Sequence, residues 1–305
     1  MDKTCVETVR LLIEAAPVIF KTPSFAMKGG TAINLFVQDM PRLSVDIDVV
    51  YTDYKTPRAE ALTSIAKAME TARSLLTEMG LEAEVSATKE GEDIKLFVRR
   101  DRNQVKIEVN QVFRGTVLPV ERLSLGAEAR RLFTTEWVAP VLAPPELYGS
   151  KLVAALDRQH PRDLFDVVGL FKQGGLTPEV VECFVCYLAG HNRPVHEVLF
   201  SRDQNFSGAF ENEFIGLTRQ AITIEQLIAV RRQLKTHLPA VLTENHRRFL
   251  LGLVTGEPDW SQMRCPHLAD LPAIRWKLQN LARLKKANPR KFAQQADELS
   301  ARFGF

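Results

Sequence analysis

Residues 28–51, KGGTAINLFVQDMPRLSVDIDVVY, constrain the fold of this chain more than any other segment. The turn Lys28–Thr31 contains Gly29 and Gly30 and leads into a helix. The free backbone amides at a helix start attract phosphate, and glycines let the phosphate approach closely. A Gly-Gly pair alone usually marks only a turn. Here a strand with acidic residues at alternate positions follows directly, so the segment predicts a phosphate-binding turn beside a cation site.

The strand predicted at residues 43–51 alternates its side chains between two faces. Asp46 and Asp48 therefore lie together, while Ile47 and Val49 face the other way. Like charges on one strand face are unfavourable, and a divalent cation with hard oxygen ligands compensates them. A solvated strand face is the alternative for an isolated Asp-x-Asp. The glycine turn favours the metal site, with Mg²⁺ or Mn²⁺ bound by the two aspartates.

Hydrophobic periodicity elsewhere predicts an α+β domain with a mixed sheet, followed by an α-helical domain. Helices are expected at residues 4–20 and 58–79, and strands follow the second helix. The prolines within residues 138–148 favour a linker, because proline interrupts both ladders and helices. We therefore expect domains at residues 1–143 and 144–305.

Composition narrows the function classes. The 305 residues are 45% hydrophobic and 25% charged, which is typical of a soluble globular protein, and the net charge of +3 does not by itself indicate a nucleic-acid partner. The N-terminal helix carries charges unlike a signal peptide, and no apolar run reaches the roughly 20 residues that span a bilayer. We expect a cytoplasmic protein without membrane contact. Cys183 and Cys186 are expected to be buried thiols rather than metal ligands.

A third acidic candidate lies in the strand segment QVKIEVN, residues 104–110. Burial of Val105, Ile107 and Val109 leaves Glu108 on the polar face. Glu108 is then a candidate general base or a ligand of a second metal, or it faces solvent without a role.

A second segment, KLVAALDRQHPRDLFDV at residues 151–167, combines cations and acids on two helices. Lys151 and Arg158 share a helical face, and Pro161 suits the first turn of the helix that follows. Asp163 lies near the start of that helix, where pairing with a neighbouring charge is the ordinary explanation for an acid.

These segments resemble the AbiEii/AbiGii and MenT-type nucleotidyltransferase toxins, which belong to the DNA-polymerase-β-like superfamily. In residues 28–51, Arg42 and Ser44 precede Asp46 and Asp48 as in the family's Arg-x-Ser/Thr-x-Asp-x-Asp strand entry. Residues 151–167 resemble the family's Lys-and-Arg-Asp segment. The resemblance implies a polymerase-β-like nucleotidyltransferase domain with a mixed sheet, followed by an α-helical domain.

The resemblance also implies roles for individual residues. Asp46 and Asp48 are the expected metal ligands and, with Lys151, Asp163 and Glu108, the catalytic set; Asp166 is the nearby rival of Asp163. Lys151 is expected to project toward the triphosphate. The nucleotide-binding residues implied are Lys28, Gly29, Gly30, Thr31, Arg42, Ser44, Lys151 and Arg158.

A basic stretch near the C-terminus is a candidate RNA contact. It contains Lys285, Lys286, Arg290 and Lys291 on a helix-like segment. Such a stretch is commonly a solvated helix face, and it is also suited to holding an RNA backbone.

The resemblance implies a Mg²⁺-dependent toxin of a toxin–antitoxin or phage-defence system, with a cognate antitoxin encoded nearby. The expected reaction transfers a nucleotide from a nucleoside triphosphate to an RNA acceptor, with the tRNA 3′ end as the leading candidate. One alternative is a transferase of the same fold that acts on a protein or small-molecule hydroxyl. Another is a nucleotide-binding regulatory module without turnover, against which the intact Asp46 and Asp48 argue.

Overall fold

The chain forms two compact units in a computed structural model that describes residues 3–87 and 94–305. The first unit comprises Met1–Leu147 with Phe214–Ala221, and the second comprises Tyr148–Glu213 with Ile222–Phe305. The first contains a mixed sheet and the second is helical, which confirms the predicted α+β class. The sequence places the division at residue 143, and the division of the chain between the two units falls within α5 (Pro144–Asp157).

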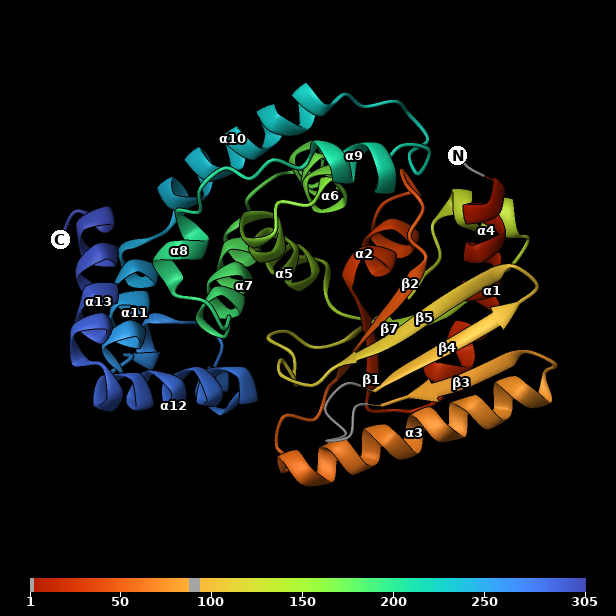
Figure 1. The fold of residues 1–305 in the computed structure, drawn as a ribbon, viewed down its shortest axis with the longest axis horizontal. Helices are drawn as coiled ribbons and strands as arrows, with labels where there is room; N and C mark the ends of the chain where they lie inside the picture. Colours follow the sequence, from red (N-terminus) through yellow and green to blue (C-terminus); the bar gives the residue numbers. More distant parts are fainter. Residues whose placement is uncertain (1–2, 88–93) are drawn as a thin grey trace. The chain divides into compact units, whose positions relative to one another are not determined.

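The first unit is built on a seven-stranded sheet in the order β3-β4-β5-β2-β1-β7-β6 (Figure 1). Strand β2 lies in the middle, antiparallel to β1 and parallel to β5. The strands are β1 (Phe25–Lys28), β2 (Asp46–Tyr51), β3 (Glu82–Ser86), β4 (Lys95–Arg100), β5 (Asn103–Asn110), β6 (Glu121–Ser124) and β7 (Val138–Val141).

Two long helices pack on this sheet and on each other, α1 (Lys3–Ile19) over β5 and α3 (Arg58–Glu78) along β3 (Figure 1). Both match the helices expected from periodicity, and each buries an apolar stripe that includes Val9 and Leu12 in α1 and Ile65 in α3. The short helix α2 (Gly29–Ala32) continues into a π-helical turn, η1 (Ile33–Val37), and packs on β2. Helix α4 (Ala127–Phe133) completes the unit.

The predicted linker at residues 138–148 is wrong, because Val138–Val141 forms strand β7 between β1 and β6. Leu125 N donates to the Trp137 carbonyl, so the alternation of an antiparallel pair puts Pro140 at a position without hydrogen bonds to β6. Its missing N–H therefore costs no bond in that ladder. Pro144 begins α5, where its fixed φ suits the first helical turn.

A later segment of the chain also belongs to the first unit. Leu43 N donates to the Leu217 carbonyl at 2.9 Å, and Arg219 N donates to the Pro41 carbonyl at 2.9 Å. Arg42 and Thr218 form an antiparallel bridge between these two donors. The residues leading into β2 are thereby paired with a segment about 175 positions further along the chain.

The second unit consists of helices. Gly149 lies where a Cβ would come within 2.7 Å of Cys183 Cβ, so its lack of a side chain lets α5 approach α7 closely. Cys183 and Cys186 are buried in α7, as expected for structural thiols. Besides α5, the helices are α6 (Pro161–Lys172), α7 (Pro178–Ala189), α8 (Val195–Leu199), α9 (Ser207–Glu213), α10 (Ile224–Val241), α11 (Glu244–Thr255), η2 (Trp260–Gln262), η3 (Leu268–Asp270), α12 (Pro272–Ala287) and α13 (Pro289–Phe303).

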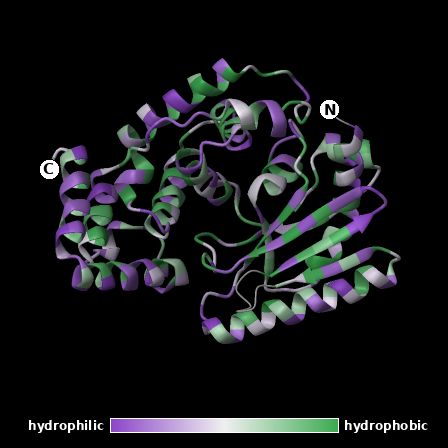
Figure 2. Ribbon diagram, viewed as in Figure 1, coloured by the Kyte–Doolittle hydropathy of each residue, from purple (hydrophilic) through white to green (hydrophobic). Residues whose placement is uncertain are grey.

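The strands of the sheet are more hydrophobic than the exposed helix α13. Figure 2 shows hydrophobic residues along the strands of the sheet, whereas α13 is mostly hydrophilic. Over residues 3–87 and 94–305, no helix combines the length and apolar character needed to cross a membrane.

Candidate functional site

The turn between β1 and α2 is shaped by two glycines that have no room for a side chain. Gly29 has a φ of +77°, and a Cβ there would lie 2.0 Å from Asp48 Oδ2. A Cβ on Gly30 would lie 2.6 Å from Arg42 Nη2. The backbone of the turn therefore lies directly against the Asp48 carboxylate and the Arg42 guanidinium.

Hydroxyl groups connect this turn to the start of β2. The Thr31 hydroxyl donates to the Asp46 carbonyl oxygen and lies 2.9 Å from Ser44 Oγ. Thr31 is fully buried, so these interactions fix α2 relative to the strand that carries the aspartates.

Arg42 is one of the largest fully buried side chains of the protein, only 2% exposed. Its Nη1 donates to the Leu43 carbonyl at 2.9 Å, and its Nη2 lies beneath Gly30. The guanidinium therefore supports the turn from the protein interior.

Strand β2 presents its carboxylates as the alternation predicts. Asp46 and Asp48 are half-buried, and Ile47 and Val49 between and after them are fully buried. In the antiparallel register with β1, Asp48 is opposite Lys28. In the parallel register with β5, Asp46 is opposite Lys106 and Asp48 is opposite Glu108. One face of the sheet thus carries acids and lysines on three adjacent strands.

Glu108 forms an ion pair with its own strand neighbour rather than completing a cluster of three acids. Lys106 Nζ lies 2.9 Å from Glu108 Oε2. Partial burial alone would lower the pKa of Lys106, but the Glu108 hydrogen bond and the charges of Asp46 and Asp48 raise it above its ordinary value. Among the described residues, no group of three or more His, Cys, Asp or Glu side chains is gathered to hold a metal. The candidate ligands are therefore the Asp46 and Asp48 pair.

The second unit contains a buried cluster of charges where α5 meets α6. Lys151 Nζ lies 2.9 Å from Asp163 Oδ1 and 3.1 Å from Asp166 Oδ2. Both aspartates are fully buried, and the Lys151 side chain is 8% exposed. Arg158 adds a bidentate interaction with Asp163, with Nε at 2.5 Å and Nη2 at 2.9 Å. The Lys151 ammonium is therefore held in one position.

Asp163 of this cluster is stabilised in its charged form. Burial alone would raise the pKa of Asp163, but the Lys151 ammonium and the Arg158 guanidinium hold it well below its usual range. Pro161 begins α6, as predicted, and places Asp163 in the first turn. Asp163 does not pair with Arg162, which lies 3.3 Å from Glu213 instead.

The family model "Nucleotidyl transferase AbiEii toxin, Type IV TA system" matches residues 10–280. The chain belongs to the AbiEii nucleotidyltransferase toxin family. It is therefore a nucleotidyltransferase, as the sequence motifs predict.

The AbiEii chain also resembles a solved structure, that of MenT4, a nucleotidyltransferase toxin from Mycobacterium tuberculosis H37Rv. The TM-score is 0.59 at 18% identity, over 79% of this chain and 86% of MenT4. This likeness supports the fold. No curated protein matches the sequence.

The predicted RNA-contact residues of this AbiEii-family protein lie where α12 ends and α13 begins. Lys285 and Lys286 are in the last turn of α12, and Arg290 and Lys291 are in the first turn of α13. All four are exposed. Lys277, earlier on α12, is instead buried and donates to the carbonyls of residues 191 and 193 at 2.9 and 2.6 Å.

Two residues of the candidate site are recognised only from the structure. Lys106 was visible on the polar face of its strand, but its ion pair with Glu108 depends on side-chain orientation. Asp166 lies three positions after Asp163, which puts both on one helix face. In the structure, both of these aspartates form ion pairs with Lys151.

Proposed function

We propose that this AbiEii-family nucleotidyltransferase transfers a nucleotide from a nucleoside triphosphate to RNA, with Mg²⁺ bound by Asp46 and Asp48. The observation that carries the proposal is the Gly29 backbone lying directly against the Asp48 carboxylate. A phosphate received by the amides of the glycine turn would then be adjacent to a metal ligand. A divalent metal there would shield the phosphates and polarise the α-phosphorus.

The aspartate pair fits a hard divalent cation. Carboxylate oxygens are the ligands that Mg²⁺ prefers, and Mg²⁺ commonly uses one or two carboxylates together with substrate phosphates. Mn²⁺ prefers the same donors. Lys106, in its ion pair with Glu108, is proposed to be a resident counter-ion that limits the negative charge of this sheet face.

We assign the nucleotide-binding roles as follows. Gly29, Gly30 and Thr31 offer backbone amides to the triphosphate, and Ser44 fixes Thr31. Arg42 acts through its support of Gly30. Lys28, Lys151 and Arg158 contribute positive charge to the triphosphate or the departing pyrophosphate.

Asp163 and Asp166 are positioning residues in this proposal, since both hold Lys151. A cation fixed before the substrate arrives needs no reorganisation during the reaction, which is the basis of electrostatic preorganisation. Glu108 is proposed to influence the reaction through Lys106.

RNA is the proposed acceptor, with the tRNA 3′ end as its leading form, and Lys285, Lys286, Arg290 and Lys291 are proposed to bind its backbone. If they hold phosphates, reversing Lys285 and Lys286 to Glu should raise the apparent KM for RNA. It should also flatten the salt dependence by roughly 0.7 in log–log slope for each phosphate that the protein no longer binds. The KM for the nucleotide should stay unchanged.

The toxin is proposed to act in the cytoplasm, where its triphosphate and RNA substrates occur, and to be controlled by a cognate antitoxin encoded nearby. A role in phage defence is the corresponding biological context. The family's description as part of a Type IV toxin–antitoxin system supports the antitoxin.

The deciding experiment offers the purified protein each α-³²P-labelled triphosphate with Mg²⁺, total cellular RNA and total cellular protein. Label in RNA supports the proposal, and sequencing of the labelled ends identifies the acceptor. Label in protein or in a small molecule would replace RNA as the acceptor class. Triphosphate binding without pyrophosphate release would indicate a regulatory module.

A further inference from the structure

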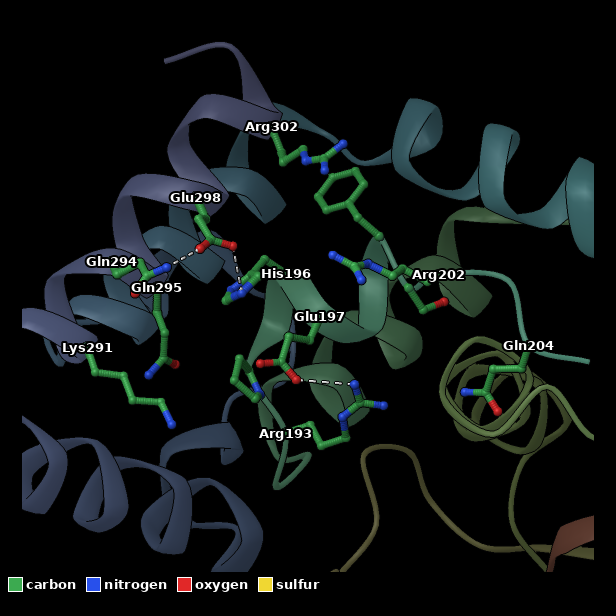
Figure 3. A pocket seen from close by; sticks show the side chains of 13 residues that line it. Arg193, His196, Glu197, Arg202, Gln204, Lys291, Gln294, Gln295, Glu298 and Arg302 are labelled. Carbon is green, nitrogen blue, oxygen red and sulfur yellow. Dashed lines mark hydrogen bonds and ion pairs between the residues drawn. The ribbon is translucent and has the colours of Figure 1, made fainter.

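The helical second unit contains a cavity that the proposed active-site residues do not line. Its volume is about 490 Å³, which lies within the range of small-molecule pockets, roughly 300–1,000 Å³. One wall is α13, and the opposite wall is α8 with the residues on either side of it (Figure 3).

Helix α13 contributes a polar stripe to this cavity. Lys291, Gln295, Glu298 and Arg302 line it at spacings of four, three and four residues, which puts them on one helix face. The apolar residues Phe292 and Leu299 of the same helix are buried in the unit.

Gln295 is the observation that points to a ligand. It is only 6% exposed, and its amide has no hydrogen-bond partner among the residues that the structure describes. Figure 3 shows its side chain extending into the cavity beside Lys291, toward Glu197 and Arg193. The amide nitrogen and oxygen are themselves open to the cavity, so a group that enters it can pair with them.

The acids of the cavity are already paired. Glu298 lies 3.1 Å from His196 Nε2 and accepts from Gln294 at 2.7 Å. Glu197 accepts from Arg193 at 3.2 Å.

The uncommitted charge of the cavity is positive. Lys291 and Arg202 are exposed at its opposite walls, and within residues 3–87 and 94–305 neither side chain has an ion-pair partner. The cavity is therefore suited to an anion.

The remaining lining is suited to a planar group. The Arg302 guanidinium lies 5.5 Å from the centre of the Phe200 ring. Bases stack on aromatic rings and on guanidinium planes in the same way. The carboxamide of Gln295, with one acceptor and two donors, matches the hydrogen-bonding edge of a base.

We propose that this cavity binds a nucleoside phosphate, with a phosphate at Lys291 or Arg202 and the base edge at Gln295. Two sources share this chemistry: a nucleotide within an RNA strand and a free nucleotide. The strand is the source expected here, because Lys285, Lys286 and Arg290 are exposed immediately before Lys291. This preference for the strand rests on the proposed RNA acceptor, whereas the nucleoside-phosphate site does not.

The test measures binding in the absence of catalysis. Fluorescence anisotropy of a fluorescein-labelled pentaribonucleotide is recorded with the full-length protein in EDTA without triphosphate. Lys291→Gln and Gln295→Met should each weaken binding roughly tenfold, as expected when one charged or buried hydrogen bond is removed. Lys172→Gln, an exposed lysine at the end of α6, is the matched control and should bind like wild type.

A competition arm separates the two sources. Unlabelled AMP, GMP, CMP and UMP are titrated against the labelled strand. Displacement only by longer strands assigns the site to RNA, and displacement by a mononucleotide at comparable concentration assigns it to a free nucleotide; both support the site.

Two results would overturn the proposal. One is wild-type affinity in both variants for both ligand types. The other is an acid-rich peptide whose binding depends on Lys291 and Gln295 while nucleotides do not bind, which would make the cavity a protein-binding site. Circular dichroism verifies the fold of Gln295→Met, and the exposed Lys291→Gln carries the test if that variant unfolds. A protein that binds the strand here yet labels no RNA would keep the cavity site and lose the proposed function.

Discussion

Two charged clusters of this protein differ in their burial and in how their acids are neutralised. Asp46 and Asp48 are half-buried on one face of β2. Each carboxylate there is close to solvent and to the other carboxylate. Asp163 and Asp166 are fully buried, and Lys151 is held between them with an almost completely covered side chain. The first arrangement is accessible to an added cation. The second already contains its cation.

The charge balance sharpens this contrast. The sheet face carries Asp46, Asp48 and Glu108 beside Lys28, Lys95 and Lys106, but all of these side chains are only partly buried, so solvent screens their charges. The buried cluster balances its two acids with Lys151 and Arg158. Substitutions in the first cluster should therefore change chemistry with little effect on stability, and substitutions in the second should change stability.

The largest effect is expected at the sheet face. Asp46→Asn and Asp48→Asn should each lower transfer by at least about a thousandfold, since an amide cannot neutralise a hard cation. The melting temperature should change little, because both carboxylates are only half-buried and each lies near lysines as well as near like charge. Labelled-triphosphate incorporation and thermal melting measure the two quantities. A wild-type rate in either variant would remove that residue from the metal site.

In the buried cluster, Lys151→Ala should lower the free energy of unfolding by about 3–5 kcal/mol, because Asp163 and Asp166 lose their shared counter-ion inside the protein. Urea denaturation gives this value, with Lys172→Gln as the exposed control. Transfer by the folded fraction should also fall severely, and triphosphate affinity moderately. Wild-type stability would contradict the burial argument, and a wild-type rate would make Lys151 purely structural.

The glycine turn offers a comparison within one unit. Gly29 and Gly80 both have positive φ, +77° and +82°, so Ala strains the backbone similarly at either position. Only at Gly29 would the new Cβ meet a side chain, that of Asp48. Gly29→Ala should reduce transfer about a hundredfold, as expected when a reacting group is misplaced by about 1 Å, and Gly80→Ala should not reduce it. Equal rates in the two variants would separate the turn from the aspartate site.

Removing the cation opposite Asp46 on the sheet face should strengthen metal binding. Lys106→Met eliminates a positive charge near Asp46 and Asp48 and releases Glu108. The affinity for Mn²⁺, measured by electron paramagnetic resonance, should rise about tenfold. Lys172→Met, at the exposed end of α6, is the control. Weaker Mn²⁺ binding in Lys106→Met would show that the lysine supports the metal site instead of opposing it.

Lys277 is a buried cation whose hydrogen bonds go to backbone carbonyls rather than to a carboxylate. Burial lowers its pKa from 10.5 to about 8, and the Glu197 charge offsets this only in part. Between these values the unfolded chain holds a proton that the folded chain has lost, so stability rises with pH. The free energy of unfolding of wild type should rise by about 1.4 kcal/mol per pH unit relative to that of Lys277→Met within this window, and it should not rise below the window. Urea denaturation of wild type and Lys277→Met at pH 7 and pH 9.5 measures this change. The same difference in the free energy of unfolding at both pH values would contradict the lowered pKa of Lys277.

The sequence alone determined the features that depend on local periodicity and local backbone chemistry. Alternation put Asp46 and Asp48 on one strand face, and the glycine pair marked the turn into α2. Proline at residue 161 marked the start of α6, and the helical stripes of α1 and α3 were equally readable. In each case neighbouring residues carry the information, so no distant contact is needed to recover it.

The tertiary structure decided everything that depends on a distant partner. Residues 138–141 looked like a linker because prolines interrupt regular structure, yet pairing with β6 and β1 makes them a strand. The partner of Arg42 at Thr218 lies far along the chain. Alternation puts Lys106 and Glu108 on one strand face, but it does not decide whether Glu108 pairs with Lys106 or with a group on another strand. The amide of Gln295 faces a cavity because α13 packs against α8. Burial and pairing of polar groups are properties of the packed chain, because the free energy of each charge depends on which side chains surround it after folding.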